Sequence, residues 1–139
     1  MAALFSDQVS EAEAKAVAGC FVASGVSFDV GEFVSDILST DGAARTGLGA
    51  SLGAGRFADE VAIVSALEQP LGIVHGEAEQ LVSLAYLRKL DFPALWRGEV
   101  QVIPDVGHAL HQEAPRKFAA LLGEFVGEAA HADELAADE

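Results

Sequence analysis

Two side chains with acid–base chemistry, Glu79 and His108, follow shortly after two apolar runs of this sequence. The runs at 71–75 and 100–103 have the length and bounding residues of buried strands. In open parallel α/β sheets, functional side chains gather just beyond the carboxyl ends of the strands. The spacing therefore predicts that a carboxylate and an imidazole lie near one edge of a sheet. At that edge the carboxylate could orient the imidazole, and the imidazole could transfer protons.

The intervening and following residues indicate the elements that would position these groups. Helical spacing returns at 81–87, and a last amphipathic helix is predicted to begin near Pro115. Strand, helix, strand and helix in this order predict a βαβα unit of a parallel sheet. Two strands do not form a stable doubly covered sheet by themselves. We therefore expect further strands to come from outside these residues.

The first sixty residues predict helices joined by turns. The indicated helix starts are the capping-box pairs Ser10 with Glu13 and Asp29 with Glu32, then Thr40 or Asp41, and a fourth helix over 57–67. The first of these helices is expected to continue to Val22. Glycine residues weaken the third.

The strand-end sequences resemble those of the α/β-hydrolase family. PLGIVHGEAE at 70–79 looks like that family's seventh strand and acid turn, and IPDVGH at 103–108 looks like its eighth strand and catalytic-histidine loop. QEAP at 112–115, followed by Phe118 and Phe125, is similar to its closing helix. The resemblance covers residues 61–127. It implies an α/β fold class, a partial α/β-hydrolase parallel sheet of two C-terminal strands with helices.

The same resemblance implies the remaining domain organisation. Residues 1–60 would be a mainly helical cap-like segment that roofs a substrate pocket, and 61–127 the C-terminal part of the hydrolase core. Residues 128–139 are rich in acidic side chains, and we expect them to be a disordered, solvated tail.

The resemblance assigns His108 the role of general base and acid, and Gly107 would give its loop conformational freedom. Glu79 occupies the position where the family usually has an aspartate. A glutamate can also orient an imidazole, although its extra methylene moves the carboxylate. The alternatives for Glu79 are a solvated turn residue or a family variant whose acid follows an earlier strand.

The nucleophile is the missing part of this pattern. Gly49-Ala50-Ser51-Leu52-Gly53 matches G-x-S-x-G, but a nucleophile elbow needs a buried strand that runs directly into the serine. Residues 41–48 contain no β-branched apolar run, and Ser51 precedes Glu79 too closely for the family's intervening elements. We therefore place Ser51 in a cap helix or loop.

The functional hypothesis is a hydrolase of ester-like small molecules that uses a Ser-His-acid triad. These residues would be its C-terminal portion, lacking the nucleophile and inactive alone. Two alternatives remain: a compact hydrolase that uses Ser51, and a non-catalytic α/β domain for binding or oligomerisation. The partner would be a small-molecule substrate, together with the missing N-terminal half of the fold or a second copy of the chain. Nothing in the sequence implies a cofactor or a metal.

Charge and composition exclude other classes of function. The net charge of −14 argues against binding nucleic acid or an anionic membrane, which need cationic surfaces. No signal sequence or membrane-spanning run is indicated, and the single cysteine, Cys20, predicts a buried thiol in a cytoplasmic protein. The 51% apolar content predicts either a large core or a surface that packs against a further segment.

Overall fold

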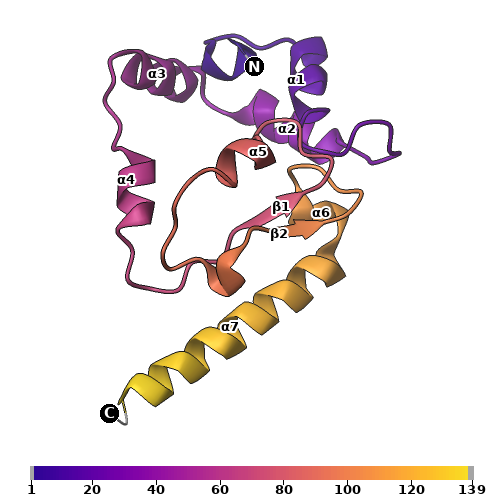
Figure 1. Ribbon diagram of the computed structural model, residues 1–139. Helices are drawn as coiled ribbons and strands as arrows, with labels where there is room; N and C mark the ends of the chain where they lie inside the picture. The colour runs from indigo at the N-terminus through magenta and orange to yellow at the C-terminus, as the bar shows by residue number, and fades with distance from the viewer. Residues whose placement is uncertain (1, 138–139) are drawn as a thin grey trace.

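The computed structural model describes residues 2–137, and the side chains of residues 2–131. Helices dominate the chain, and two short strands lie between the N-terminal helices and a long C-terminal helix (Figure 1). In chain order the elements are η1 (Ala2–Phe5), α1 (Glu11–Ala18), α2 (Gly31–Ser39), α3 (Gly42–Gly53), α4 (Glu60–Ser65), β1 (Val74–Gly76), α5 (Leu84–Leu87), η2 (Trp96–Gly98), β2 (Gln101–Ile103), α6 (Leu110–Glu113) and α7 (Pro115–Ala137).

The two strands pair in parallel, which confirms the predicted βαβα connection. The register places His75 opposite Val102 and Gly76 opposite Ile103. An isolated parallel bridge between Leu71 and Leu95 extends the pairing backwards. Within residues 2–137 these are the strands of one two-stranded sheet, so each has a partner on one side only.

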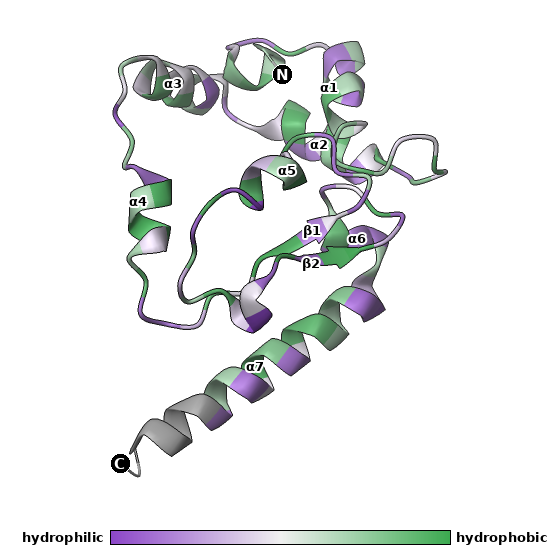
Figure 2. Cartoon of the chain, viewed as in Figure 1, coloured by the Kyte–Doolittle hydropathy of each residue, from purple (hydrophilic) through white to green (hydrophobic). Residues whose placement is uncertain are grey.

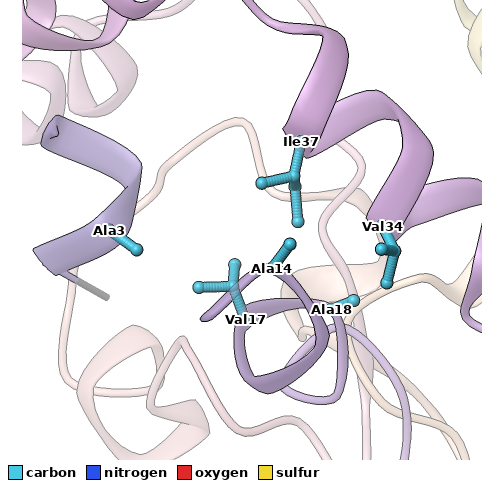
Figure 3. Packing of buried hydrophobic residues seen from close by; sticks show 6 residues of the cluster. All are labelled: Ala3, Ala14, Val17, Ala18, Val34 and Ile37. Carbon is cyan, nitrogen blue, oxygen red and sulfur yellow. The ribbon is translucent and has the colours of Figure 1, made fainter. Parts of the chain in front are cut away.

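The N-terminal helices form a small core of their own. Its buried members are small or β-branched side chains from η1, α1 and α2, which lets the helices approach closely. They are Ala3, Ala14, Val17, Ala18, Val34 and Ile37 (Figure 3). The predicted capping box at Ser10 is confirmed, because its hydroxyl accepts the N–H of Glu13 while the Glu13 carboxylate accepts the N–H of Ser10.

Arg45 joins this helical part from α3. Its side chain is 8% exposed, and its guanidinium donates to four backbone carbonyl oxygens, those of Ser6, Asp7, Ile37 and Thr40. Ile37 and Thr40 lie at the carboxyl end of α2, where unpaired carbonyls carry the negative end of the helix dipole. The buried positive charge is thus compensated by backbone dipoles.

Several predicted helix boundaries are wrong, and side chains explain the shifts. The Asp29–Glu32 box does not form: Asp29 accepts the N–H of Gly31, and α2 begins after Val30 without a side-chain cap. The helix predicted over 57–67 is only α4, because the carboxylate of Asp59 accepts the N–H of Ala62 and fixes the start there. Asp41, rather than Thr40, caps α3.

The first helix is also shorter than predicted. It ends at Ala18, because the following residues leave the helix axis to hydrogen-bond with loops from the C-terminal half of the chain. Cys20 is partly exposed rather than buried, and its thiol contacts the carbonyl of Ala16.

Apolar and polar residues alternate along the long helix α7 (Figure 2), which contacts the segments that precede β1 and β2 through Phe125. Phe125 lies so close to Gly72 that a Cβ there would meet its ring at 3.2 Å. The indole of Trp96 packs edge-on against Phe125 and donates its N–H to Glu128 at 2.7 Å. Arg97 stacks over the same indole and pairs with Glu124 and Glu128.

In the segment expected to be a disordered tail, the structure describes α7 as continuing through Ala137. Alanine is frequent in this segment and is the strongest helix former, and Glu128 is held by Trp96 and Arg97. Asp138 and Glu139 lie outside the described residues.

Apolar cavities flank both faces of the segment at 71–74, which leads into β1. A cavity of about 260 Å³ is lined by Gly72 and Val74 together with α7, and one of about 370 Å³ by Leu71 and Ile73 together with α4 and α5. Alternate residues of a strand point to opposite faces, so both faces of this segment lack complete packing. Within the described part of the chain, no helix has the length and apolar character needed to span a bilayer.

Candidate functional site

Glu79 and His108 meet just beyond the carboxyl ends of the two strands. Oε2 of Glu79 lies 2.8 Å from Nδ1 of His108. The glutamate side chain is 4% exposed, whereas the imidazole is 46% exposed. A buried carboxylate thus faces one nitrogen of a ring that is open to solvent. An ionised carboxylate only accepts, so this contact assigns the proton to Nδ1 and leaves Nε2 as an acceptor.

The other carboxylate oxygen of Glu79 is held by the backbone. Oε1 accepts the N–H of Leu81 at 2.6 Å and that of Val82 at 3.2 Å. Burial acts to raise the pKa of Glu79, but these N–H groups and the His108 imidazole outweigh it, so the pKa lies below the ordinary value of 4.5. The same bonds delay the following helix, which was predicted from residue 81 but begins at Leu84.

The acid turn and the histidine loop touch through glycine. A Cβ on Gly76 would lie 2.2 Å from the carbonyl oxygen of Gly107, so only glycine allows this approach. Across the contact the N–H of Ala78 donates to the carbonyl of Val106 at 2.9 Å. Asp105 takes a positive φ of 63° as the chain leaves β2. These features bring Glu79 within reach of His108.

His75 supports the acid turn from inside the sheet. Its ring is buried, and Nε2 lies 3.0 Å from the carbonyl oxygen of Val82, to which it must donate. Nδ1 of this ring is buried without a hydrogen-bond partner. His75 therefore holds the far end of the turn that carries Glu79.

Ser51 lies in α3, where its hydroxyl donates to the carbonyl of Arg56 at 3.2 Å. No strand leads into it. Among residues 2–131, whose side chains the structure describes, no serine hydroxyl is hydrogen-bonded to His108. The ring of Phe21 lies beside the imidazole instead, with centroids 6.0 Å apart.

Two polar residues near the site, Gln80 and Glu113, were not singled out from the sequence. Nε2 of Gln80 donates to the carbonyls of Gly19 and Val22. The Glu113 carboxylate accepts the N–H of Ala23 and that of Gly107. The only sequence signal was that each lies within a few residues of a predicted site residue, because the partners at 19–23 are distant in the chain. Glu77 contacts the N–H of Asp105 at 3.4 Å and takes no part in these bonds.

No group of three or more His, Cys, Asp or Glu side chains in the described part of the chain is arranged to hold a metal ion. The chemistry that this arrangement supports is proton transfer at Nε2 of His108. Nδ1 would remain hydrogen-bonded to Glu79 while Nε2 takes up and returns the proton of a hydroxyl group.

Comparison with known proteins adds the wider context of this geometry. No protein-family model matches the chain, and no curated protein is similar to it at a significant level. Solved structures are similar. The N-acyl homoserine lactonase AidH in complex with N-butanoyl homoserine is 30% identical with a TM-score of 0.78, over 90% of this chain and 44% of that chain.

Two further solved structures are also similar to this chain over part of their length. A serine-to-glycine variant of the lactonase complexed with N-hexanoyl homoserine lactone is 30% identical, with a TM-score of 0.82 over 94% of this chain and 47% of that one. CarC, a serine hydrolase involved in carbazole degradation, is 16% identical with a TM-score of 0.65, over 85% of this chain and 47% of that one, which shows similarity of fold alone. The chain thus spans less than half the length of these structures.

Proposed function

Because the chain belongs to the α/β-hydrolase fold family and corresponds to its C-terminal part, we propose that it supplies the base and the orienting acid of a serine hydrolase. His108 is the general base and acid, and Glu79 orients it. The nucleophilic serine comes from the N-terminal half of the fold rather than from Ser51. Residues 1–60 act as a cap-like segment over the substrate.

One observation carries this proposal: the 2.8 Å contact between the buried Glu79 carboxylate and Nδ1 of the exposed His108 ring. A buried carboxylate fixes both the tautomer and the orientation of the imidazole, and it stabilises the imidazolium formed during proton transfer. The exposed side of the ring is the side that a hydroxyl and a substrate must reach.

The substrate class that we propose is an ester or a lactone, with an N-acyl homoserine lactone as the first compound to test. AidH is described as an N-acyl homoserine lactonase and is 30% identical over most of this chain. One of its structures is a glutamate-to-glycine variant complexed with N-hexanoyl homoserine. A glutamate studied by substitution in that lactonase is consistent with Glu79, rather than an aspartate, as the acid here.

The proposed reaction proceeds in two balanced steps. The serine oxygen attacks the lactone carbonyl while Nε2 of His108 takes the serine proton, and the ring C–O bond then breaks as the imidazolium returns that proton to the leaving oxygen. A water molecule next attacks the acyl-serine, giving its proton to Nε2. The serine leaves with that proton, and the product is the open hydroxy acid.

A chimera tests this function directly. The C-terminal part of AidH would be replaced by residues 2–137 of this chain, and opening of N-hexanoyl homoserine lactone would be followed by acid release. We expect turnover that falls by about 10⁴-fold in His108→Ala, since general base catalysis and serine activation are both lost. Glu79→Gln should lower it less, and Ser51→Ala should leave it unchanged.

Three outcomes would overturn the proposal. A chimera that folds and binds lactone, but turns over equally with or without His108, would exclude the catalytic role. Turnover by the isolated chain that Ser51→Ala abolishes would establish the compact hydrolase instead. A folded chimera without any turnover would favour the non-catalytic binding domain.

A further inference from the structure

The carboxylate of Glu113 joins two parts of the chain that lie far apart in sequence. Oε1 accepts the N–H of Gly107 at 2.8 Å, and Oε2 accepts the N–H of Ala23 at 2.7 Å. Gly107 directly precedes His108, whereas Ala23 belongs to the segment that follows α1. Both oxygens of one carboxylate are therefore used in a backbone bridge.

Residues 19–23, which include Ala23, form further hydrogen bonds and contacts with the site. We call these residues the clamp segment. The N–H of Ala109 donates to the carbonyl of Phe21 at 2.7 Å. A Cβ on Gly107 would lie 2.4 Å from the carbonyl carbon of Val22, so the two backbones are in direct contact. The Phe21 ring lies beside the His108 imidazole.

The acid turn holds the same segment from the other side. Gln80 directly follows Glu79 and donates from Nε2 to the carbonyl of Val22 at 2.7 Å and to that of Gly19 at 3.1 Å. The clamp segment is thus hydrogen-bonded both to the turn that carries the acid and to the loop that carries the base.

We propose that Glu113 is a positioning residue that couples the helical N-terminal segment to the orientation of His108. This inference rests on the proposed function, in which His108 is the base and residues 1–60 the cap. The clamp segment cannot leave the histidine loop without breaking the bond from the N–H of Ala23 to Glu113 and the bond from the N–H of Ala109 to Phe21. The placement of the cap-like helices and the alignment of the imidazole on Glu79 therefore change together. Glu113 does not touch the reacting atoms and acts only through the backbone beside His108.

The test uses the intact chain and does not depend on turnover. Glu113→Gln keeps the shape of the side chain but replaces one acceptor oxygen with an NH₂ group that cannot accept from a backbone N–H. Amide hydrogen exchange of Ala23 and Gly107 reports on the bridge. Long-range ¹H–¹⁵N spectra of the imidazoles report the fraction of His108 that carries its proton on Nδ1.

We expect Glu113→Gln to speed exchange at Ala23 and Gly107 by about tenfold or more, the ratio that corresponds to loss of one charge-assisted bond. It should also lower the Nδ1-protonated fraction of His108. Gln80→Ala serves as a second variant that leaves Glu113 intact, and it should change both readouts in the same direction. Glu77→Gln is the matched control, because that carboxylate contacts the histidine loop but not the clamp segment.

Each result has a definite meaning. Faster exchange with an unchanged His108 tautomer would show that Glu113 only stabilises the fold, and would overturn the inference. Equal changes in Glu77→Gln would overturn it as well. If Glu79→Gln leaves the His108 tautomer unchanged, the dyad of the proposed function fails instead, so the two failures are distinguishable.

Discussion

Gly76 faces the carbonyl oxygen of Gly107 so closely that a Cβ on Gly76 would lie only 2.2 Å from it. This contact brings the acid turn against the histidine loop, and the N–H of Ala78 donates across it to Val106. The distance between Glu79 and His108 is therefore set by how closely the backbones of the acid turn and the histidine loop approach each other.

Adding a methyl group at either glycine should therefore damage the site and the fold. We expect Gly76→Ala and Gly107→Ala each to lower the free energy of unfolding by about 2–3 kcal/mol, because the clashing atoms are backbone and cannot move aside. Gly123→Ala is the control: it lies in the middle of α7 with open space around it, and should raise stability by about 0.5–1 kcal/mol. Urea unfolding of the three variants measures these differences, and equal effects would contradict the contact.

Glu79 should make the stability of the chain depend on acid pH. Its pKa in the folded state lies below the ordinary 4.5, so the ionised form contributes stability that is complete above about pH 4.5. That contribution is lost as the pH falls through the lower folded pKa. In urea titrations at pH 6 and at successively lower pH, Glu79→Gln should therefore lose less stability on acidification than the original chain. A parallel loss in both proteins would assign the pH dependence to other carboxylates.

Arg45 should tolerate neither an apolar nor a charged replacement. Arg45→Met leaves four backbone carbonyls without their donor, and we expect a loss of more than about 3 kcal/mol. Arg45→Lys should recover little of it, because one ammonium cannot reproduce the planar fork of donors. Arg56→Met, at an exposed arginine, should change the free energy of unfolding measured in urea by no more than about 0.5 kcal/mol.

The effect of Ser51→Ala on stability, as well as on turnover, tests how the serine of the G-x-S-x-G match is placed. The serine lies within α3 and is only partly buried, so its loss should alter the free energy of unfolding by less than about 0.5 kcal/mol. Asp41→Ala in the same helix removes an N-cap and should cost about 1 kcal/mol. Thermal unfolding followed by circular dichroism separates the two, and a larger effect at Ser51 would contradict its placement in α3.

Glu128 should anchor the last turns of α7. Glu128→Ala removes the acceptor of the Trp96 indole N–H and a partner of Arg97, whereas Glu124→Ala removes only an Arg97 contact. We expect faster amide exchange from residue 128 onward in the first variant and little change in the second. The overall stability should change little, because these groups are largely exposed. Equal amide exchange rates in both variants would show that the Trp96 contact does not anchor the last turns of α7.

The sequence predicted those parts of the fold that short-range chemistry decides. The Ser10–Glu13 capping box, the Asp41 cap and the start of α7 at Pro115 each depend on neighbours within one helical turn. The parallel pairing followed from an apolar run on each side of a helical segment. The second capping box failed because Asp29 satisfied the N–H two residues ahead instead.

Long-range contacts were beyond the reach of the sequence pattern. The resemblance singled out Glu79 and His108, and the structure places them together, while their catalytic role stays a prediction. Gln80 and Glu113 were missed because their partners lie at 19–23, more than fifty residues away for Gln80 and ninety for the Ala23 bond. The end of α1 was misplaced for the same reason, since the residues after it form tertiary hydrogen bonds. The late start of α5 has a local cause, because the N–H groups of Leu81 and Val82 bond to the Glu79 side chain instead.

The short strand β1 should also make the behaviour of the protein depend on its concentration. Within the described residues it has a ladder partner on one side only, and apolar cavities lie on both faces of the segment that leads into it. Unpaired strand edges recruit other chains through the same hydrogen bonds that build a sheet. The average molar mass measured by light scattering should therefore rise with protein concentration, and unfolding midpoints should shift along a dilution series. Dilution thus becomes a variable in every measurement of this chain, alongside pH and salt.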